Sequence, residues 1–143
     1  MAINIKQVSA CLDECRKHLT TELLPFWLDR CKDDKNGGFI THFDKDGNDS
    51  GEDEKSMLAQ ARTVFSMSTA HRAGYGDGLC AEYASHGVDF LIEKMWDDEY
   101  GGFYWITDRA GNVTCDKKIL YGLSFIMYAL SEYTMATGDQ RGA

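Results

Sequence analysis

Apolar residues recur at helical spacing along the chain, and in two stretches they occupy one side only. Between residues 8 and 27 the apolar face is formed by Val8, Leu12, Cys15, Leu19 and Leu23. Between residues 79 and 96 the apolar positions are Tyr83, Phe90, Leu91 and Met95, set against Glu82, Asp89 and Glu93. This pattern predicts two amphipathic helices that each bury a single face.

Two further helical stretches are predicted, at residues 55–72 and 118–135. Between Ile119 and Met135 the chain is apolar nearly all round. A helix without a polar face must be enclosed on most sides. One-sided and enclosed helices alternate along the chain, which predicts an outer and an inner layer, as in a double ring of helical hairpins.

An internal repeat supports this layout. The segment Asp33–Phe39 returns as Asp97–Phe103 at an offset of 64 residues, with identical residues at the Asp-Asp and Gly-Gly-Phe positions. The match continues through Asp44, Gly47 and Asn48, which correspond to Asp108, Gly111 and Asn112. The chain therefore holds about two copies of one unit, at residues 1–76 and 77–143.

Each unit has the same predicted order of elements. A first helix ends at a Gly-Gly pair, which we expect to cap it in a left-handed conformation. A short β-rich segment then runs into Asp-x-x-Gly-Asn, which predicts a β-hairpin, and a second helix completes the unit.

Two hairpins cannot close a ring of helices. The sequence thus predicts an all-α, incomplete (α/α) toroid with short β-hairpins between its outer and inner helices. We expect apolar surface to be exposed along Ile119–Met135, with self-association as one consequence.

The composition and net charge of the chain indicate which kinds of binding partner to expect. The 143 residues include 43% hydrophobic and 27% charged residues and carry a formal charge of −8. An acidic chain repels phosphate backbones and anionic lipid, so we expect no nucleic-acid or membrane partner. The longest uncharged run, Ile119–Ser131, is too short to span a bilayer. The N-terminus lacks a signal-peptide pattern, and a cytoplasmic location is expected.

No cofactor or metal site is expected from the sequence. The five cysteines form no Cys-x-x-Cys pair, and we interpret them as structural, although Cys11 and Cys15 share a helical face. The acidic run at residues 49–54 lacks the pattern of a calcium loop and is interpreted as a solvated loop.

Arg62 is the first candidate functional residue. Helical spacing places it on one face with Leu58, Phe65 and Thr69. An arginine on an inward face needs an anion or a polar ligand. An internal ion pair to an acid on another helix is the alternative role.

Three stretches resemble the family of N-acylglucosamine 2-epimerases and cellobiose 2-epimerases. They are Met57–Phe65, Tyr100–Trp105 with Asp108–Gly111, and Lys118–Phe125 with Tyr128–Tyr133. The resemblance implies an (α/α)6 barrel of sugar epimerases and isomerases. Six units of this length need roughly 380 residues, so residues 1–143 would be the N-terminal part of a single barrel domain.

The same resemblance implies roles for individual residues. Arg62 matches an active-site arginine of the family, which would bind a sugar oxygen and stabilise an enediolate. Tyr121 matches a substrate-site tyrosine, although an aromatic core role is equally open. His42, in the first hairpin, is a candidate to line the cleft. Trp105 offers a face for a sugar ring, with core packing as the alternative.

These matches imply a carbohydrate 2-epimerase or aldose–ketose isomerase acting on a small sugar. A histidine removes the proton beside the open-chain carbonyl, and a second histidine returns a proton to the cis-enediolate. The resemblance places both histidines beyond residue 143, and it matches neither to His18, His42, His71 or His86. His18 and His86 have polar neighbours on outer helices, and we expect both to be solvated. Residues 1–143 alone are therefore expected to be inactive. The alternative is a non-catalytic helical repeat module that binds a sugar or a protein.

Overall fold

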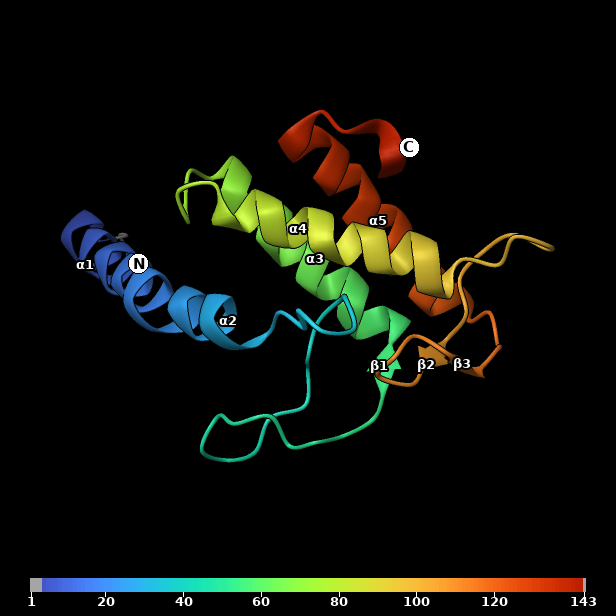
Figure 1. The fold of residues 1–143 in the computed structure, drawn as a ribbon. Helices are drawn as coiled ribbons and strands as arrows, with labels where there is room; N and C mark the ends of the chain where they lie inside the picture. Colours follow the sequence, from blue (N-terminus) through green and yellow to red (C-terminus); the bar gives the residue numbers. More distant parts are fainter. Residues whose placement is uncertain (1–3, 143) are drawn as a thin grey trace.

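The structure is a computed structural model that describes residues 4–142, most of them in helices (Figure 1). A long N-terminal helix is built from α1 (Ile5–His18), the π-helical turn η1 (Leu19–Leu23) and α2 (Leu24–Arg30). The other helices are α3 (Met57–Arg72), α4 (Leu79–Phe90) with the π-helical turn η2 (Leu91–Met95), α5 (Leu120–Thr137) and the short 3-10 helix η3 (Gln140–Gly142). All four predicted helical stretches are confirmed.

Local chemistry explains where these helices begin and widen. The side chain of Asn4 accepts a hydrogen bond from the backbone N–H of Lys6, and Ser56 caps α3 through the N–H of Ala59 at 3.3 Å. Pro25 lies at the start of α2 and has no N–H to give to the preceding turn. The wide turn η1 immediately before Pro25 lets the helix continue past it.

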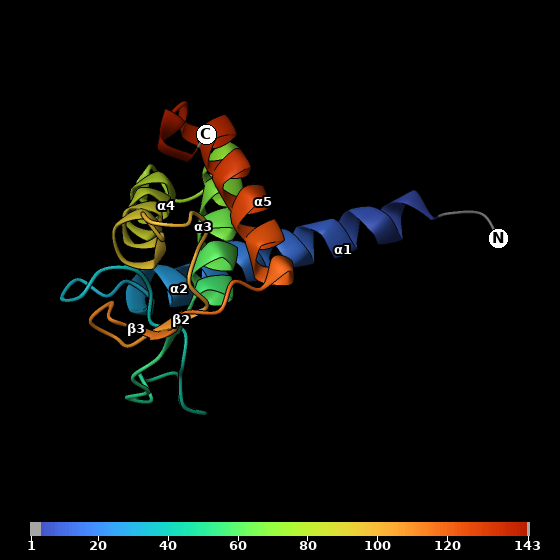
Figure 2. The same ribbon diagram turned by 90° about the vertical axis from the view of Figure 1, so that its right-hand side faces the viewer.

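Helix α3 lies at the centre of the molecule. It packs against α5 on one side and α4 on the other, while α1 extends away from the rest (Figures 1 and 2). The core around α3 contains Cys31, Phe39, Met57, Ala61, Val64, Met67, Cys80, Ala84, Val88, Phe90, Leu91, Met95, Phe103, Ile126, Ala129 and Tyr133. The helices follow one another in two pairs, the N-terminal helix with α3 and α4 with α5, and α2 also contacts α4.

The Gly-Gly pairs do not cap helices, and that prediction is wrong. Helix α2 ends at Arg30, and the residue after it, Cys31, is still right-handed. Gly37 and Gly38 have φ values of 80° and 65° and close a turn in which the N–H of Asp33 bonds to the carbonyl of Gly38 at 3.0 Å. A turn anchored by Asp33 separates the end of α2 from the Gly-Gly pair, and the helix-end pattern of the sequence does not predict this turn.

A small antiparallel sheet joins the two units. Its strands are β1 (Lys55–Ser56), β2 (Ile106–Thr107) and β3 (Val113–Cys115), in that order across the sheet. The hairpin of β2 and β3 confirms the prediction for the second unit. In the first unit the corresponding hairpin is reduced to one isolated bridge between Phe43 and Asp49. The pairing of Lys55 with Thr107 fixes the start of α3 against the second unit.

Helix α5 is not enclosed by the described residues. Leu120 is 81% exposed, Met127 72% and Tyr121 57%, and this confirms the expected apolar surface. Helix α1 buries none of its residues against the described part of the chain, so the predicted burial of one face is wrong for this helix. Within residues 4–142, every helix is too short or too polar to cross a bilayer.

Candidate functional site

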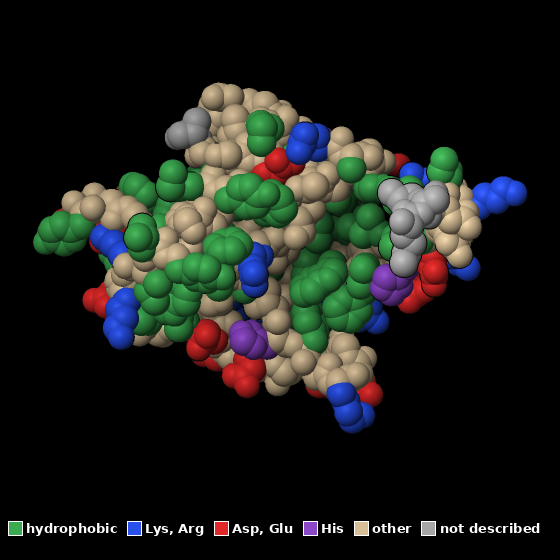
Figure 3. All heavy atoms as spheres, turned by 180° about the vertical axis from the view of Figure 1, so that it is seen from behind, with side chains coloured by type: hydrophobic (Ala, Val, Ile, Leu, Met, Phe, Trp, Pro, Cys, Tyr) green, Lys and Arg blue, Asp and Glu red, His purple; other side chains and the backbone are tan. Residues whose placement is uncertain are grey.

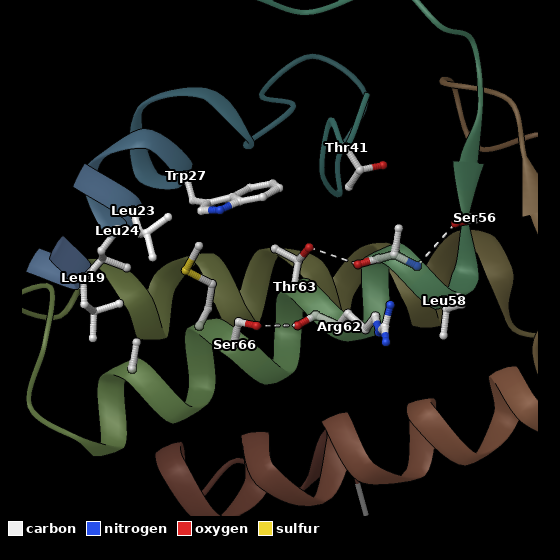
Figure 4. Close-up of a pocket in the computed structure, with 13 residues that line it drawn as sticks. Leu19, Leu23, Leu24, Trp27, Thr41, Ser56, Leu58, Arg62, Thr63 and Ser66 are labelled. Atoms are coloured by element: carbon white, nitrogen blue, oxygen red, sulfur yellow. Dashed lines mark hydrogen bonds between the residues drawn. The ribbon is translucent and has the colours of Figure 1, made fainter. Parts of the chain in front are cut away.

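A groove of about 580 Å³ separates the N-terminal helix from α3 (Figure 4). We call it the Arg62 groove. Its walls are formed by Leu19, Leu23, Leu24 and Trp27 on one side, by Leu58, Ala59, Arg62, Thr63, Ser66, Met67 and Ala70 on the other, and by Thr41 and Ser56 at one end. Arg62 is the one charged residue among these. Apolar walls with a few convergent polar groups are typical of ligand pockets.

Arg62 and Tyr121 come together through one aromatic ring. The guanidinium carbon of Arg62 lies 4.9 Å from the ring centre of Phe125, a cation–π distance. Tyr121 meets the same ring edge-on, with ring centres 5.1 Å apart. Both Arg62 and Tyr121 are exposed. Two side chains on neighbouring helices thus face one region of surface.

The ion-pair role for Arg62 is not observed. Among residues 4–142 the ion pairs involve other cations, and α3 and α5 are instead linked by Arg72 and Glu132 at 2.7 Å. The guanidinium therefore keeps its N–H donors available while Phe125 covers one of its faces. An available donor set of this kind suits an oxyanion or a sugar oxygen.

A buried ion pair fixes the start of α3, seven residues before Arg62. Lys55 is 2% exposed, and its ammonium group donates to Asp33 at 2.8 Å and to the carbonyl of Gly37. The ammonium also lies 4.8 Å from the ring centre of Phe90. Arg109 of the second unit reaches Asp33 at 3.4 Å and pairs with Asp49. The network joins both units around the first residues of the helix that carries Arg62.

The environment determines the charge state of this pair. Burial alone would raise the pKa of Asp33, but hydrogen bonds from Lys55 and Asn36 outweigh it and hold the pKa well below its usual range. Burial lowers the pKa of Lys55, and Asp33 offsets part of that shift. The lowered pKa of Asp33 keeps its carboxylate charged at neutral pH.

The second unit repeats the pair in a more exposed form. Lys118 bonds to Asp97, and this contact lowers the pKa of Asp97 to about 2. The Lys118 side chain is 28% exposed, against 2% for Lys55. The two lysines are 63 positions apart and open equivalent helices, so the pair is a property of the repeated unit.

Of the predicted site residues, Arg62 lines the Arg62 groove, whereas Tyr121, His42 and Trp105 do not. His42 is half-buried beside Glu54, Lys55 and Arg109, in a cleft of about 10 Å³ that holds roughly one water. Trp105 is also half-buried and packs against Gly122. Its backbone carbonyl accepts from the N–H of Met57 at 2.9 Å.

The other histidines occupy three different settings. His18 is exposed and lies 3.1 Å from Glu22. His71 is half-buried in the last turn of α3. His86, expected to be solvated, is instead half-buried with Nε2 3.0 Å from the carbonyl of Gly38. That expectation is wrong because the Gly-Gly turn folds over α4.

The comparison with known proteins supplies the deciding observation. The model of the N-acylglucosamine 2-epimerase (GlcNAc 2-epimerase) family matches residues 38–143, which is most of the chain. The chain belongs to the N-acylglucosamine 2-epimerase family. The match includes α3, α5 and both polar residues around Phe125.

Relatives within the N-acylglucosamine 2-epimerase family agree on one name. The chain is 36% identical over 132 residues to a cellobiose 2-epimerase of Bacteroides fragilis, covering 88% of this chain and 32% of the relative. A cellobiose 2-epimerase of Ruminococcus albus is 33% identical over 129 residues, covering 90% of this chain and 33% of the relative. The chain thus spans about a third of the length of these relatives.

Solved structures confirm the fold class. The cellobiose 2-epimerase from Bacillus thermoamylovorans B4167 superposes with a TM-score of 0.86 at 34% identity, over 94% of this chain and 34% of that one. The all-α fold is therefore part of the helical barrel of the N-acylglucosamine 2-epimerase family, with two helical hairpins present.

Some residues of the site were missed from the sequence. Phe125 carries no polar signal, and only the packing of α3 on α5 shows that it joins Arg62 to Tyr121. Asp33 and Lys55 did carry a signal, because both recur one unit later. Arg109 carried none, since its counterpart in the first unit is Lys45, which pairs with its neighbour Asp46.

Proposed function

We propose that this chain contributes the Arg62–Tyr121 part of the sugar site in a cellobiose 2-epimerase-type epimerase or isomerase. The observation that carries the proposal is the shared contact of both side chains with Phe125. Residues 1–143 would then be the N-terminal part of a single barrel domain. A small sugar is the substrate class, and the cytoplasm is the proposed location.

The chemistry needs a group that stabilises negative charge. When a base removes the proton from C2 of the open-chain sugar, the electron pair moves onto the carbonyl oxygen and a cis-enediolate forms. The guanidinium of Arg62 donates to that oxygen as its charge develops, which lowers the barrier. A proton returned to C2 from the opposite face gives the epimer, and a proton delivered to C1 gives the ketose.

Tyr121 positions the sugar in this proposal. Its hydroxyl lies at the first turn of α5, next to the ring of Phe125, and can bond to a sugar hydroxyl. His42 and Trp105 stay proposed second contacts. None of the four histidines is assigned as the acid or the base, so residues 1–143 alone are proposed to be inactive.

A chimera tests this proposal. Residues 1–143 replace the matching third of the Bacteroides fragilis cellobiose 2-epimerase, and epimerisation of cellobiose is followed in deuterated water. We expect deuterium at C2 of the product. The Arg62→Ala variant of the chimera should lose on the order of 10²-fold or more in kcat, with an unchanged melting temperature.

Matched measurements separate a catalytic from a structural role. Exposed Arg16→Ala on α1 is the control variant and should leave kcat unchanged. If Arg62→Ala lowers the melting temperature while activity per folded molecule survives, the residue is structural and the proposal fails. Deuterium at C2 of cellobiose, mannose or N-acetylmannosamine with residues 1–143 alone would contradict the proposed inactivity.

A further inference from the structure

An acidic loop leads from the first Gly-Gly turn towards β1. Residues 44–54, which we call the acidic loop, carry six carboxylates and one cation, Lys45. The loop projects below the helices in both ribbon views (Figures 1 and 2). From the opposite side, acidic side chains lie beside a histidine at the lower edge, below the hydrophobic side chains of the same face (Figure 3). Like charges at this density repel one another, so a cation from another segment is needed to hold the loop in place.

Arg109 of the second unit supplies such a cation. Its Nε lies 3.4 Å from the carboxylate of Asp33, and its Nη2 bonds to Asp49 in the acidic loop. Its backbone N–H donates to the carboxylate of Asp53 at 3.1 Å. The hydrogen bond from Arg109 holds the pKa of Asp49 below its usual range. One residue therefore contacts the acidic loop at two places and the buried ion pair of Lys55 at a third.

The turn that presents Arg109 is closed by its own hydrogen bonds. The N–H of Asp108 donates to the carbonyl of Asn112 at 2.8 Å, and the carboxylate of Asp108 accepts from the N–H of Asn112 at 2.9 Å. Gly111 in this turn packs against Lys94, where a Cβ would lie 2.8 Å from Lys94 Cγ. The paired strands β2 and β3 flank the turn, whereas the first unit has one isolated bridge at this place. The turn of the second unit is therefore the fixed partner, and it holds the acidic loop.

The contact between Arg109 and Asp49 also determines where His42 lies. Asp49 forms the isolated bridge with Phe43, and the N–H of the next residue, Ser50, donates to the carbonyl of His42 at 3.1 Å. His42 and Arg109 line the same small cleft. The backbone of His42 is therefore held by the segment that Arg109 binds.

The residues on either side of the acidic loop reach the Arg62 groove. Thr41, next to His42, lines both the small cleft and the groove. Ser56, which follows the loop, lines the same end of the groove and pairs with Ile106 of the second unit. A displacement of the loop would therefore shift the end wall of the groove that contains Arg62.

We propose that Arg109 is a positioning residue for sugar binding, which clamps the acidic loop to the second unit and thereby holds His42 beside the Arg62 groove. This inference rests on the proposed function, in which His42 is a sugar contact. Every contact that carries it joins the two units of this chain, so further units of a barrel would not replace these contacts. Arginine suits the role because its planar guanidinium can bond to two carboxylates at once, whereas lysine supplies a single point charge.

Hydrogen exchange tests the clamp without any measurement of activity. The protein is the chimera with the Bacteroides fragilis enzyme, in which the rest of the barrel is present. Amide exchange in peptides covering residues 43–54 should be on the order of 10-fold faster in Arg109→Gln than in the parent chimera. Arg109→Lys should give an intermediate rate, because lysine keeps the charge and reaches one carboxylate.

Two further variants separate the clamp from a general loss of structure. Asp49→Asn removes the contact on the loop side alone and should also speed exchange of residues 43–54, with exchange in α4 unchanged. Lys35→Gln is the control, since it removes an exposed positive charge from the Gly-Gly turn and should leave the loop as it is. Unchanged exchange of the loop in Arg109→Gln overturns the proposal.

Kinetics of the same chimera connect the clamp with the sugar. Arg109→Gln should raise KM for cellobiose on the order of 10-fold and leave kcat within about threefold, because Arg62 stays in place on α3. His42→Ala should raise KM by a similar factor. The double variant should show little more than the larger single effect, since both changes act through one contact. An unchanged KM in Arg109→Gln, or two effects on KM that multiply, overturns the proposal.

The two measurements also separate this inference from the proposed function. A parent chimera that does not epimerise cellobiose contradicts the proposed function. Exchange of residues 43–54 in that same protein still shows whether Arg109 holds the loop.

Discussion

The ammonium group of Lys55 connects the turn at Asp33 with the first residues of α3. It is almost fully buried, and its partners come from a segment 22 positions earlier in the chain. Removing one member of a buried ion pair leaves an uncompensated charge in the interior. The placement of α3, and with it of Arg62, therefore depends on Lys55, a side chain that does not line the Arg62 groove.

Replacing Lys55 by Met tests that dependence. The Asp33 carboxylate would keep its hydrogen bonds from Asn36, but its one remaining cation would be Arg109, at 3.4 Å. We expect the free energy of unfolding, measured with urea, to fall by about 3–5 kcal/mol. Lys118→Met is the matched control, because its more exposed pair should contribute much less to the free energy of unfolding. Equal losses in the two variants would mean that burial does not distinguish the pairs.

Residue-level prediction depends on whether a residue carries its own chemical signal. Arg62 was singled out as a charged residue on an otherwise inward face and Tyr121 through the family resemblance. Both contact Phe125 in the structure, and their roles in binding or catalysis stay predictions. His86 was misjudged because its partner is a backbone carbonyl 48 positions away. Contacts of that kind depend on the fold of a loop, which helical periodicity does not encode.

The close packing of helices around α3 depends on glycine residues, which have no side chain. Gly122 is inside α5, where glycine is ordinarily destabilising, yet a Cβ there would lie 2.5 Å from Trp105 Cζ3 and 2.7 Å from Met57 Cε. The glycine therefore sets the distance between the two inner helices.

Gly122→Ala should reverse the usual sign of this substitution. In an exposed helix interior, Ala in place of Gly stabilises by about 1 kcal/mol. At Gly122 we expect a loss of about 1–3 kcal/mol in thermal or urea unfolding, because Trp105 and Met57 must move. Ser131→Ala, at an exposed position of the same helix, should be neutral or slightly stabilising. Stabilisation by Gly122→Ala would show that the helices can separate freely.

Element-level prediction was strongest for the helices. Their four stretches were found because apolar spacing is a local property of the sequence. The sheet order β1-β2-β3 was not found, since it pairs the loop of the first unit with the hairpin of the second. The π-helical turn η2 was not predicted, because its sequence contains no proline or glycine that would indicate an irregular turn.

The molecule as a whole combines a large negative charge with two apolar faces. The charge of −8 per chain opposes any assembly of identical copies, because like-charged molecules repel. Helix α5 carries one acidic residue, Glu132, which is already paired with Arg72. Ion pairs therefore contribute little to association through α5.

Added salt should strengthen self-association of residues 1–143 through the exposed apolar face of α5. Raising sodium chloride from about 0.05 to 0.5 M shortens the range of charge repulsion from more than 10 Å to below 5 Å, while burial of apolar surface is maintained. Sedimentation equilibrium should show a Kd that falls as salt rises. A Kd that rises with salt would instead indicate that attractive charges hold the copies together.

The pairing of Arg62 with Phe125 bears on how a duplicated unit can diverge. Two identical units would place the same residue at both positions, and those residues would face each other across the helix pair. A facing pair of arginines repels, and a facing pair of phenylalanines leaves the surface without a hydrogen-bond donor. The two units can therefore present a guanidinium at this point of the surface only if their sequences differ there. Divergence of the second unit from the first is what allows Arg62 to be kept.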